Sequence, residues 1–530
     1  MMAAVTSAPA RLRTPRAVRA VPLSAARLLR LELRRSVMPW ILPLIAALFW
    51  FDSYRPSTGT AALYGLRTFW NMGQGHTIID FGPFVAGAAA WMGSRDGRRD
   101  MADLVTATAW PRWTVQLATW AATAVWAVAA YLVFVAVMFA VYARQGVAGT
   151  PPWWWVAAGA AAVAAFSAAG FAVGAYWPSR FAAPVAAFGG FLAMALSSRT
   201  GFSHTTGWAQ ILPTNSNGNF DGSAQANAGI FYPWTPDLPV ARIMFLAGIA
   251  VAALGLTGLP ARSGGRRLRC AAAVVALAGV ASAWTAVDLA STARLTTHGM
   301  VIPALHDAAN DVPIRYTPAC GRAGTVPVCV NPAYRSWLPD LTAALAPMLA
   351  ETAGLPGAPA RAAQFAAPYP SNNGALGEPV TLGGQPPVLR LSLGLLNMPG
   401  SCRLCVGPAV QKGFAGQIKL LFAHAFVDAG ARPGSPAQQA VQAALEDTAG
   451  VPFADQTMLL TMTGTPWWGQ PALLALTNGS ESGNGPGPLA GPVYAAARRF
   501  AALTPAARHA WLSAHLAALR AGQLTLKELP

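Results

Sequence analysis

The densest group of ionisable side chains in the apolar half of the chain lies in a short segment between two apolar runs. The segment follows Trp91 and ends before Pro111-Arg112. Its charged members are Arg95, Asp96, Arg98, Arg99, Asp100 and Asp103. They lead into a short amphipathic stretch, and the proline restarts the next apolar run, which predicts a short helix lying along a membrane surface. The simplest role for these charges is to anchor the loop in water.

Two further ionisable residues lie at one end of an apolar run. Asp80, preceded by His76, is near one end of the second run. A carboxylate within a membrane span is a functional candidate by default, because burying its charge in lipid is costly. Water reaches this depth, however, and a proton or ion relay needs several such groups nearer the middle of the membrane. His76 and Asp80 are therefore a candidate intramembrane polar site, and the sequence does not favour an ion relay.

Four of the five cysteines lie beyond residue 290, namely Cys320, Cys329, Cys402 and Cys405. Their confinement to one part of the chain predicts disulfides, and the pairs 320–329 and 402–405 are the simplest of three connectivities. Cys402-Arg-Leu-Cys405 could instead be a redox pair or half of a zinc site, although no second C-x-x-C follows. These alternatives remain open at the level of sequence.

The motifs of common catalytic sites are absent. The chain has no phosphate-binding G-x-x-x-x-G-K-[ST], no zinc-binding H-E-x-x-H and no G-x-S-x-G. We therefore expect that the protein is not an enzyme and needs no cofactor or metal. If ATP drives its work, the ATPase is a separate polypeptide.

The elements that must position these residues are seven long apolar runs, each long enough to cross a hydrocarbon core of about 30 Å. They lie at residues 38–52, 77–93, 114–142, 153–176, 181–197, 240–258 and 270–289. A leucine- and arginine-rich segment at 23–35 precedes them and suits a helix in the membrane interface. A generic charged flank to the first span explains that segment equally well.

Charge decides the orientation. Of the net charge of +17, residues 1–290 carry +13 and residues 291–530 carry +4. The excess lies in short loops, where the positive-inside rule explains it, so we expect no nucleic-acid partner. With a cytoplasmic N-terminus, 17 arginines fall on inner segments and five on outer ones. Seven spans then place residues 291–530 outside the cell membrane.

The fold class expected is therefore an α-helical polytopic membrane protein with a C-terminal extracellular domain that is α+β and mostly helical. Short strands are predicted at Val312–Tyr316 and Val388–Leu395, and a helix that begins at Asn331-Pro332 is expected to reach Glu351. Pro339 and Pro347 should break or kink it. Further helices are predicted at 413–429, 436–449, 488–503 and 505–521.

One arrangement resembles a known family. The interfacial Leu/Arg segment is followed by a second span that ends in Gly93-Ser-Arg-Asp-Gly-Arg-Arg99 and runs into a short helix closed by Pro-Arg. This resembles the permease subunits of bacterial type-2 ATP-binding-cassette exporters, and the arginine- and alanine-rich composition suggests an actinobacterial genome. The outer loop at 198–240 fits as well. The resemblance covers roughly residues 20–260 and rests on a degenerate motif.

The resemblance implies that Arg95–Asp103 docks on a separate ATPase subunit, and that the chain forms a homodimer or pairs with a related permease in the lipid bilayer. The chain departs from the family at Asp96, where Glu is usual, and in its seventh run and large last domain. The domains expected are a basic arm with an interfacial helix, a six-span permease-like core, a seventh span and an extracellular domain. They occupy residues 1–37, 38–260, 261–290 and 291–530.

The function expected is that of a membrane subunit of a transporter with an unknown substrate. The alternative is a membrane-anchored extracellular binding or scaffold domain, or a degenerate peptidase-like ectodomain, without transport activity. On that alternative, the domain 291–530 should fold on its own.

Overall fold

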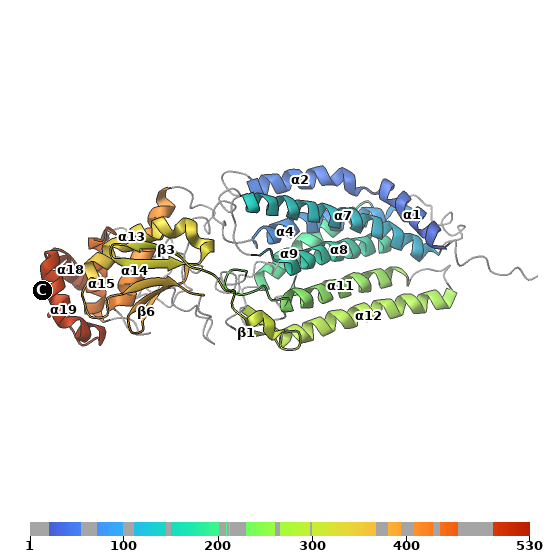
Figure 1. Ribbon diagram of the computed structural model, residues 1–530. Helices are drawn as coiled ribbons and strands as arrows, with labels where there is room; N and C mark the ends of the chain where they lie inside the picture. Colours follow the sequence, from blue (N-terminus) through green and yellow to red (C-terminus); the bar gives the residue numbers. More distant parts are fainter. Residues whose placement is uncertain are drawn as a thin grey trace, which may run out of the picture.

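The protein is mostly helical and divides into a helical bundle and a domain built on a small sheet, which contains the C-terminus (Figure 1). This computed structural model describes residues 21–54, 72–98, 111–144, 150–200, 208, 211–212, 229–259, 265–296, 299–366, 380–393, 408–427, 435–453 and 491–530.

Each of the seven apolar runs forms a helix, and these helices lie side by side (Figure 1). The elements of the bundle are α1 (Val21–Arg35), α2 (Met38–Tyr54), α4 (Met72–Gly93), α5 (Arg95–Arg98), α7 (Arg112–Arg144), α8 (Trp153–Tyr176), α9 (Ala182–Thr200), α11 (Asp237–Thr257) and α12 (Gly265–Ser291). Apolar length predicted all seven helices, because a long apolar run without charges favours a continuous helix.

Within the described residues, four of these helices are long and apolar enough to cross a membrane, and they are α7, α8, α11 and α12. The apolar segments at Met38–Leu48 in α2 and Ala182–Leu196 in α9 are shorter. Large apolar side chains remain exposed on α12, where Leu277 and Trp284 keep 69% and 74% of their surface. Such a surface is compatible with lipid around the bundle.

Glycines allow α4 and α8 to approach closely. Gly170 and Gly174 on α8 lie one turn apart, and a Cβ on either would overlap the backbone carbonyl of Ala86 or Ala90 on α4. Small residues at this spacing let helices pack backbone to backbone, which is a common contact between helices in membranes. The predicted second and fourth spans are therefore held together along their length.

The last part of the chain folds around a five-stranded sheet. Its strands are β3 (Ala319–Ala323), β4 (Val326–Val330), β5 (Arg361–Gln364), β6 (Val380–Gly383) and β7 (Val388–Leu391), in the order β3-β4-β5-β7-β6. Pairing is parallel at β4-β5 and β5-β7 and antiparallel at both edges. A separate hairpin of β1 (Arg294–Thr296) and β2 (Gly299–Val301) follows α12.

Helices pack against this sheet and against each other to complete the domain. They are η4 (Pro332–Trp337), α13 (Leu338–Thr352), α14 (Pro408–Val427), α15 (Pro436–Thr448), α18 (Gly491–Ala501) and α19 (Pro505–Arg520); the short η3 (Ala308–Asp311) follows β2 in the chain. Helix α13 packs on β3 and β4, α14 on β6, and α15 on α14 and α18. We call residues 294–530 the sheet domain.

The helix expected from Asn331 has a break where a proline was predicted to interrupt it. The Asn331 side chain accepts a hydrogen bond from the Ala333 N–H at 3.0 Å and caps the 3-10 helix η4. Pro339 then lies in the first turn of α13, where a missing N–H costs nothing. Pro347 stands inside α13 without ending it, so of the break or kink predicted there, the break does not occur.

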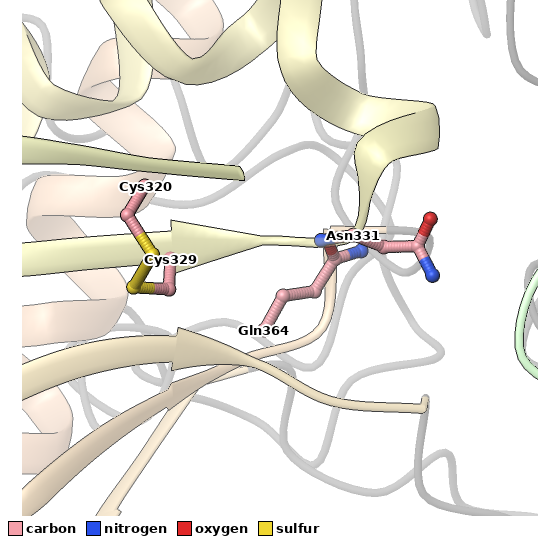
Figure 2. The surroundings of a disulfide bond; sticks show 4 residues. All are labelled: Cys320, Cys329, Asn331 and Gln364. Carbon is pink, nitrogen blue, oxygen red and sulfur yellow. A yellow bond between two sulfur atoms is a disulfide. The ribbon is translucent and has the colours of Figure 1, made fainter. Parts of the chain in front are cut away.

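The predicted disulfide between Cys320 and Cys329 is confirmed. The two residues are directly opposite each other on the antiparallel strands β3 and β4, and the disulfide joins these strands (Figure 2). Beyond it, the Oε1 of Gln364 on β5 accepts the backbone N–H of Asn331 at 2.9 Å. Disulfides persist in oxidising compartments, which is compatible with an extracellular domain.

The predicted strand at Val312–Tyr316 was wrong, whereas β7 confirms part of the one at Val388–Leu395. The segment instead pairs with the residues that precede α11, where the Ile314 N–H donates to the Phe231 carbonyl at 2.8 Å. Phe231 is 6% exposed and belongs to the core of the sheet domain together with Ile230. The loop between α9 and α11 thus contributes to that core.

Candidate functional site

The charged segment after α4 was the leading candidate from sequence, and the structure describes its first half. Arg95, Asp96 and Arg98 belong to the single turn α5, whereas Arg99, Asp100 and Asp103 lie outside the described residues. The turn follows α4 after Ser94, and α1, to which it is joined, lies at the end of the bundle opposite the sheet domain (Figure 1). We call this the far end.

A two-pronged ion pair joins α5 to α1. Arg95 donates from Nη1 and Nη2 to the two carboxylate oxygens of Glu32 at 3.0 and 3.2 Å. The Glu32 side chain is 4% exposed and that of Arg95 is 21% exposed. Arg95 also donates from Nε to Asp96 at 3.3 Å. Burial lowers the pKa of Arg95, but the hydrogen bonds and charge of Glu32 and Asp96 outweigh burial and raise this pKa above its ordinary value.

Arg98 folds back over the end of α4. Its guanidinium carbon lies 3.6 Å from the centre of the Trp91 ring. Its Nε donates to the Ser94 hydroxyl at 3.0 Å, and its Nη2 donates to the Trp91 carbonyl at 2.9 Å. The positive charge therefore complements the C-terminal end of α4, where carbonyls lack helical partners.

The same turn rests on the segment after α8. A Cβ on Gly97 would overlap Pro178, and one on Gly93 would overlap the Phe171 carbonyl. Nearby, Tyr176 at the end of α8 donates its hydroxyl to the Leu256 carbonyl on α11 at 2.5 Å. Helices α4, α8 and α11 are thus fastened to one another at the far end.

The described part of the segment is held by contacts with three neighbouring elements. Arg95 and Arg98 point their charges at α1 and α4, so they hold the turn in place. The backbone joins α5 to α4, and Gly97 packs against Pro178 in the segment after α8.

Other candidates from the sequence are placed less completely. His76 and Asp80 are in α4, but their side chains lie outside the described residues, as do Cys402 and Cys405. Within the described part of the chain, no group of three His, Cys, Asp or Glu side chains could hold a metal ion.

Comparison with known proteins gives no family for this chain. No family model, curated protein or solved structure matches it. The geometry and chemistry of the residues therefore carry the functional argument alone.

Sequence reasoning missed Glu32, which is the acidic partner of the site. The signal was present, since Glu32 is the single acid in a helix with arginines at 27, 30, 34 and 35. An acid in such a helix weakens its attraction to an anionic membrane surface, so it needs another reason to be there. Its partner lies 63 residues away, which no local pattern reveals.

Proposed function

We propose that the protein is the membrane-spanning subunit of an ATP-binding-cassette transporter and acts with a separate ATPase. In this proposal α2, α4, α7, α8, α9, α11 and α12 cross the membrane, and the far end of the bundle is cytoplasmic. The sheet domain then lies outside, where an oxidising environment preserves the Cys320–Cys329 disulfide. The chain is not an enzyme itself, and its substrate is unknown.

One observation carries the proposal, namely the buried pair between Glu32 and Arg95. A surface loop that only anchors the chain does not need a buried carboxylate such as that of Glu32, which is 4% exposed. Removing a charged group from water costs on the order of several kcal/mol. A turn that receives force from a motor subunit does need a stiff connection to the helices. The pair makes α5 such a connection.

The docking surface proposed is the segment from Asp96 to Asp103. Two copies of the chain, or this chain with a related permease, would present two such segments to a pair of ATPase subunits. Charges of both signs suit a specific protein contact because they orient the partner as well as attract it.

The proposal is tested by purifying the tagged full chain from its native membranes and measuring vanadate-sensitive ATP hydrolysis in the eluate. The unaltered chain should bring this activity with it, and Arg99→Glu should reduce it at least about tenfold, since like charges at a docking contact cost several kcal/mol. Arg267→Glu is the matched control, because Arg267 is exposed at the start of α12, remote from α5 in sequence. Absence of the activity, or equal loss in both variants, would contradict the proposal.

The second candidate is a membrane-anchored binding or scaffold domain, and the size of the core in the sheet domain favours it. That alternative expects residues 291–530 to fold alone. Ile230 and Phe231 lie in the same core, so a fragment starting at 291 would lack two of its apolar residues. Either function must therefore treat the outer loop as part of the domain.

A further inference from the structure

Three side chains connect the outer end of α11 with the segment that leads into the sheet domain. Asp237 begins α11 and is 0% exposed. Its Oδ2 accepts the Ile302 N–H at 2.9 Å and lies 3.1 Å from Nδ1 of His306. On the other side of the ring, Nε2 of His306 lies 3.1 Å from both carboxylate oxygens of Asp311.

An imidazole between two carboxylates depends on its charge. The imidazolium has two N–H groups and can donate to Asp237 and Asp311 together. The neutral ring has one N–H, so one of the two carboxylates then faces a lone pair and the contact becomes repulsive. A metal ion does not explain the arrangement, because the carboxylates contact opposite nitrogens of the ring and cannot share one ion.

We propose that His306 is a pH-sensitive clasp that holds the base of the sheet domain to α11 when its imidazole is protonated and releases it when the proton leaves. The clasp would act in the same way whether or not the protein is a transporter. The protonated imidazole needs two hydrogen-bond acceptors, and these are the carboxylates of Asp237 in the bundle and Asp311 in the sheet domain.

The electrostatics favour the closed state. Burial lowers the pKa of His306, but the hydrogen bond to Asp311 and the charge of Asp237 outweigh burial and raise that pKa above its ordinary value. A histidine with a raised pKa in the folded state stabilises the contact fully below about pH 6.5, and the contribution is lost as the pH rises through the raised value. The clasp is therefore closed in mild acid and opens toward alkaline pH.

The other charged groups around the ring do not compete for it. The carboxylate of Asp307 accepts the Ala309 N–H at 2.9 Å and caps η3. The guanidinium of Arg242, further along α11, lies over the Trp155 ring at 4.9 Å. Asp288 on α12 and Arg294 on β1 are exposed. Asp237 and Asp311 are the charges that raise the pKa of His306.

Opening the clasp would free one attachment and leave another. The hydrogen bond from Ile314 to Phe231 keeps the segment on the outer loop, and Trp234 keeps that loop on the Thr150 carbonyl at 2.7 Å. The tie that is lost is the one to the first turn of α11. The sheet domain would therefore loosen from α11 without detaching from the bundle.

The test uses the full chain in lipid nanodiscs between pH 5.5 and 8.5. Hydrogen exchange at C2 of His306 reports its titration, and backbone exchange of the peptide that contains Ile302, corrected for the intrinsic rate, reports the clasp. We expect exchange of that amide to speed up about tenfold from acid to alkaline pH. The amide donates to Asp237, and the charge-assisted hydrogen bond by which His306 holds this carboxylate becomes weaker when the imidazole loses its proton. His306→Gln should remove this dependence and show the fast rate throughout.

The matched control is His509→Gln, because His509 on α19 bonds to the Ala353 carbonyl at 2.9 Å and takes no part in the clasp. This variant should keep the pH dependence of the parent. If His306→Gln does not fold, Asp311→Asn serves instead and should move the midpoint to lower pH. A flat profile in the parent, a dependence that survives in His306→Gln, or an unmoved midpoint in Asp311→Asn would overturn the proposal.

Discussion

The sheet domain contains a carboxyl group that should make it less stable as the pH rises. Glu446 on α15 is 0% exposed. Its Oε1 accepts a hydrogen bond from Gln442 at 3.2 Å, and among the described residues its Oε2 has no hydrogen-bond partner. Burial raises the pKa of Glu446 to about 8, against a smaller opposing effect of the Gln442 hydrogen bond. At neutral pH the group is therefore mostly protonated in the folded domain.

The magnitude follows from the difference between the two states. An unfolded glutamate has a pKa of 4.5. Ionisation of Glu446 therefore stabilises the unfolded chain above pH 4.5, but it stabilises the folded chain only above about pH 8. Between these two values, each pH unit lowers the free energy of unfolding by about 1.4 kcal/mol. At pH 7 the free energy of unfolding is lowered by about 3 kcal/mol, a large share of the stability of a typical domain.

Glu446→Gln removes the ionisation and keeps the shape. We expect the variant to be about 3 kcal/mol more stable than the parent at pH 7, to approach the parent near pH 4.5, and to lose the slope between these values. The assay is hydrogen exchange of peptides from α15 in the full chain in nanodiscs, in which about 3 kcal/mol slows exchange roughly a hundredfold.

Asp447→Asn is the matched control for that experiment. Asp447 is the next residue of the same helix, and its side chain is half-buried rather than buried. This variant should keep the slope of the parent. A variant Glu446→Gln whose free energy of unfolding depends on pH as in the parent, or that is less stable than the parent at pH 7, would refute the role given to Glu446.

Three further perturbations test the packing. Gly174→Ala should lower the thermal stability of the purified protein by about 2 kcal/mol through overlap with α4, whereas Gly189→Ala should not, because a Cβ there has no atom within 4 Å; equal effects would contradict the close approach. Glu32→Gln should cost about 2 kcal/mol and speed hydrogen exchange in α1, and unchanged exchange would show that the pair with Arg95 does not hold α5. Phe231→Ala should destabilise the sheet domain by about 3–5 kcal/mol, measured by exchange in α13 and α14; an effect confined to the bundle would contradict a shared core.

The sequence predicted the helices well and the contacts between distant segments poorly. Apolar length is a property of consecutive residues, so all seven runs formed helices with ends close to those expected. Helix caps such as Asn331 are equally local and were read correctly. The cross-strand pair Cys320–Cys329 was predicted because the two residues are near each other in the chain.

The remaining features depend on residues far apart in the chain. Glu32 and Arg95 are separated by 63 residues, and Asp237 and His306 by 69. The error at Val312–Tyr316 has the same origin, because the backbone partner of this β-like segment is Phe231, between α9 and α11, rather than a neighbouring strand. Hydropathy and spacing carry no information about such pairings.

The proposed transporter function depends on contact between the charged segment after α4 and a separate ATPase. The most direct test places a photo-crosslinking amino acid at a single position of the full chain in native membranes, as Arg99→p-benzoylphenylalanine, with Arg144→p-benzoylphenylalanine as the comparison. Arg144 is exposed at the last residue of α7, which the proposed topology places on the other side of the membrane from α5. We expect a crosslink to an ATP-binding-cassette ATPase from position 99 and none from position 144. No such crosslink from position 99, or an equal one from both positions, would contradict the proposed docking contact.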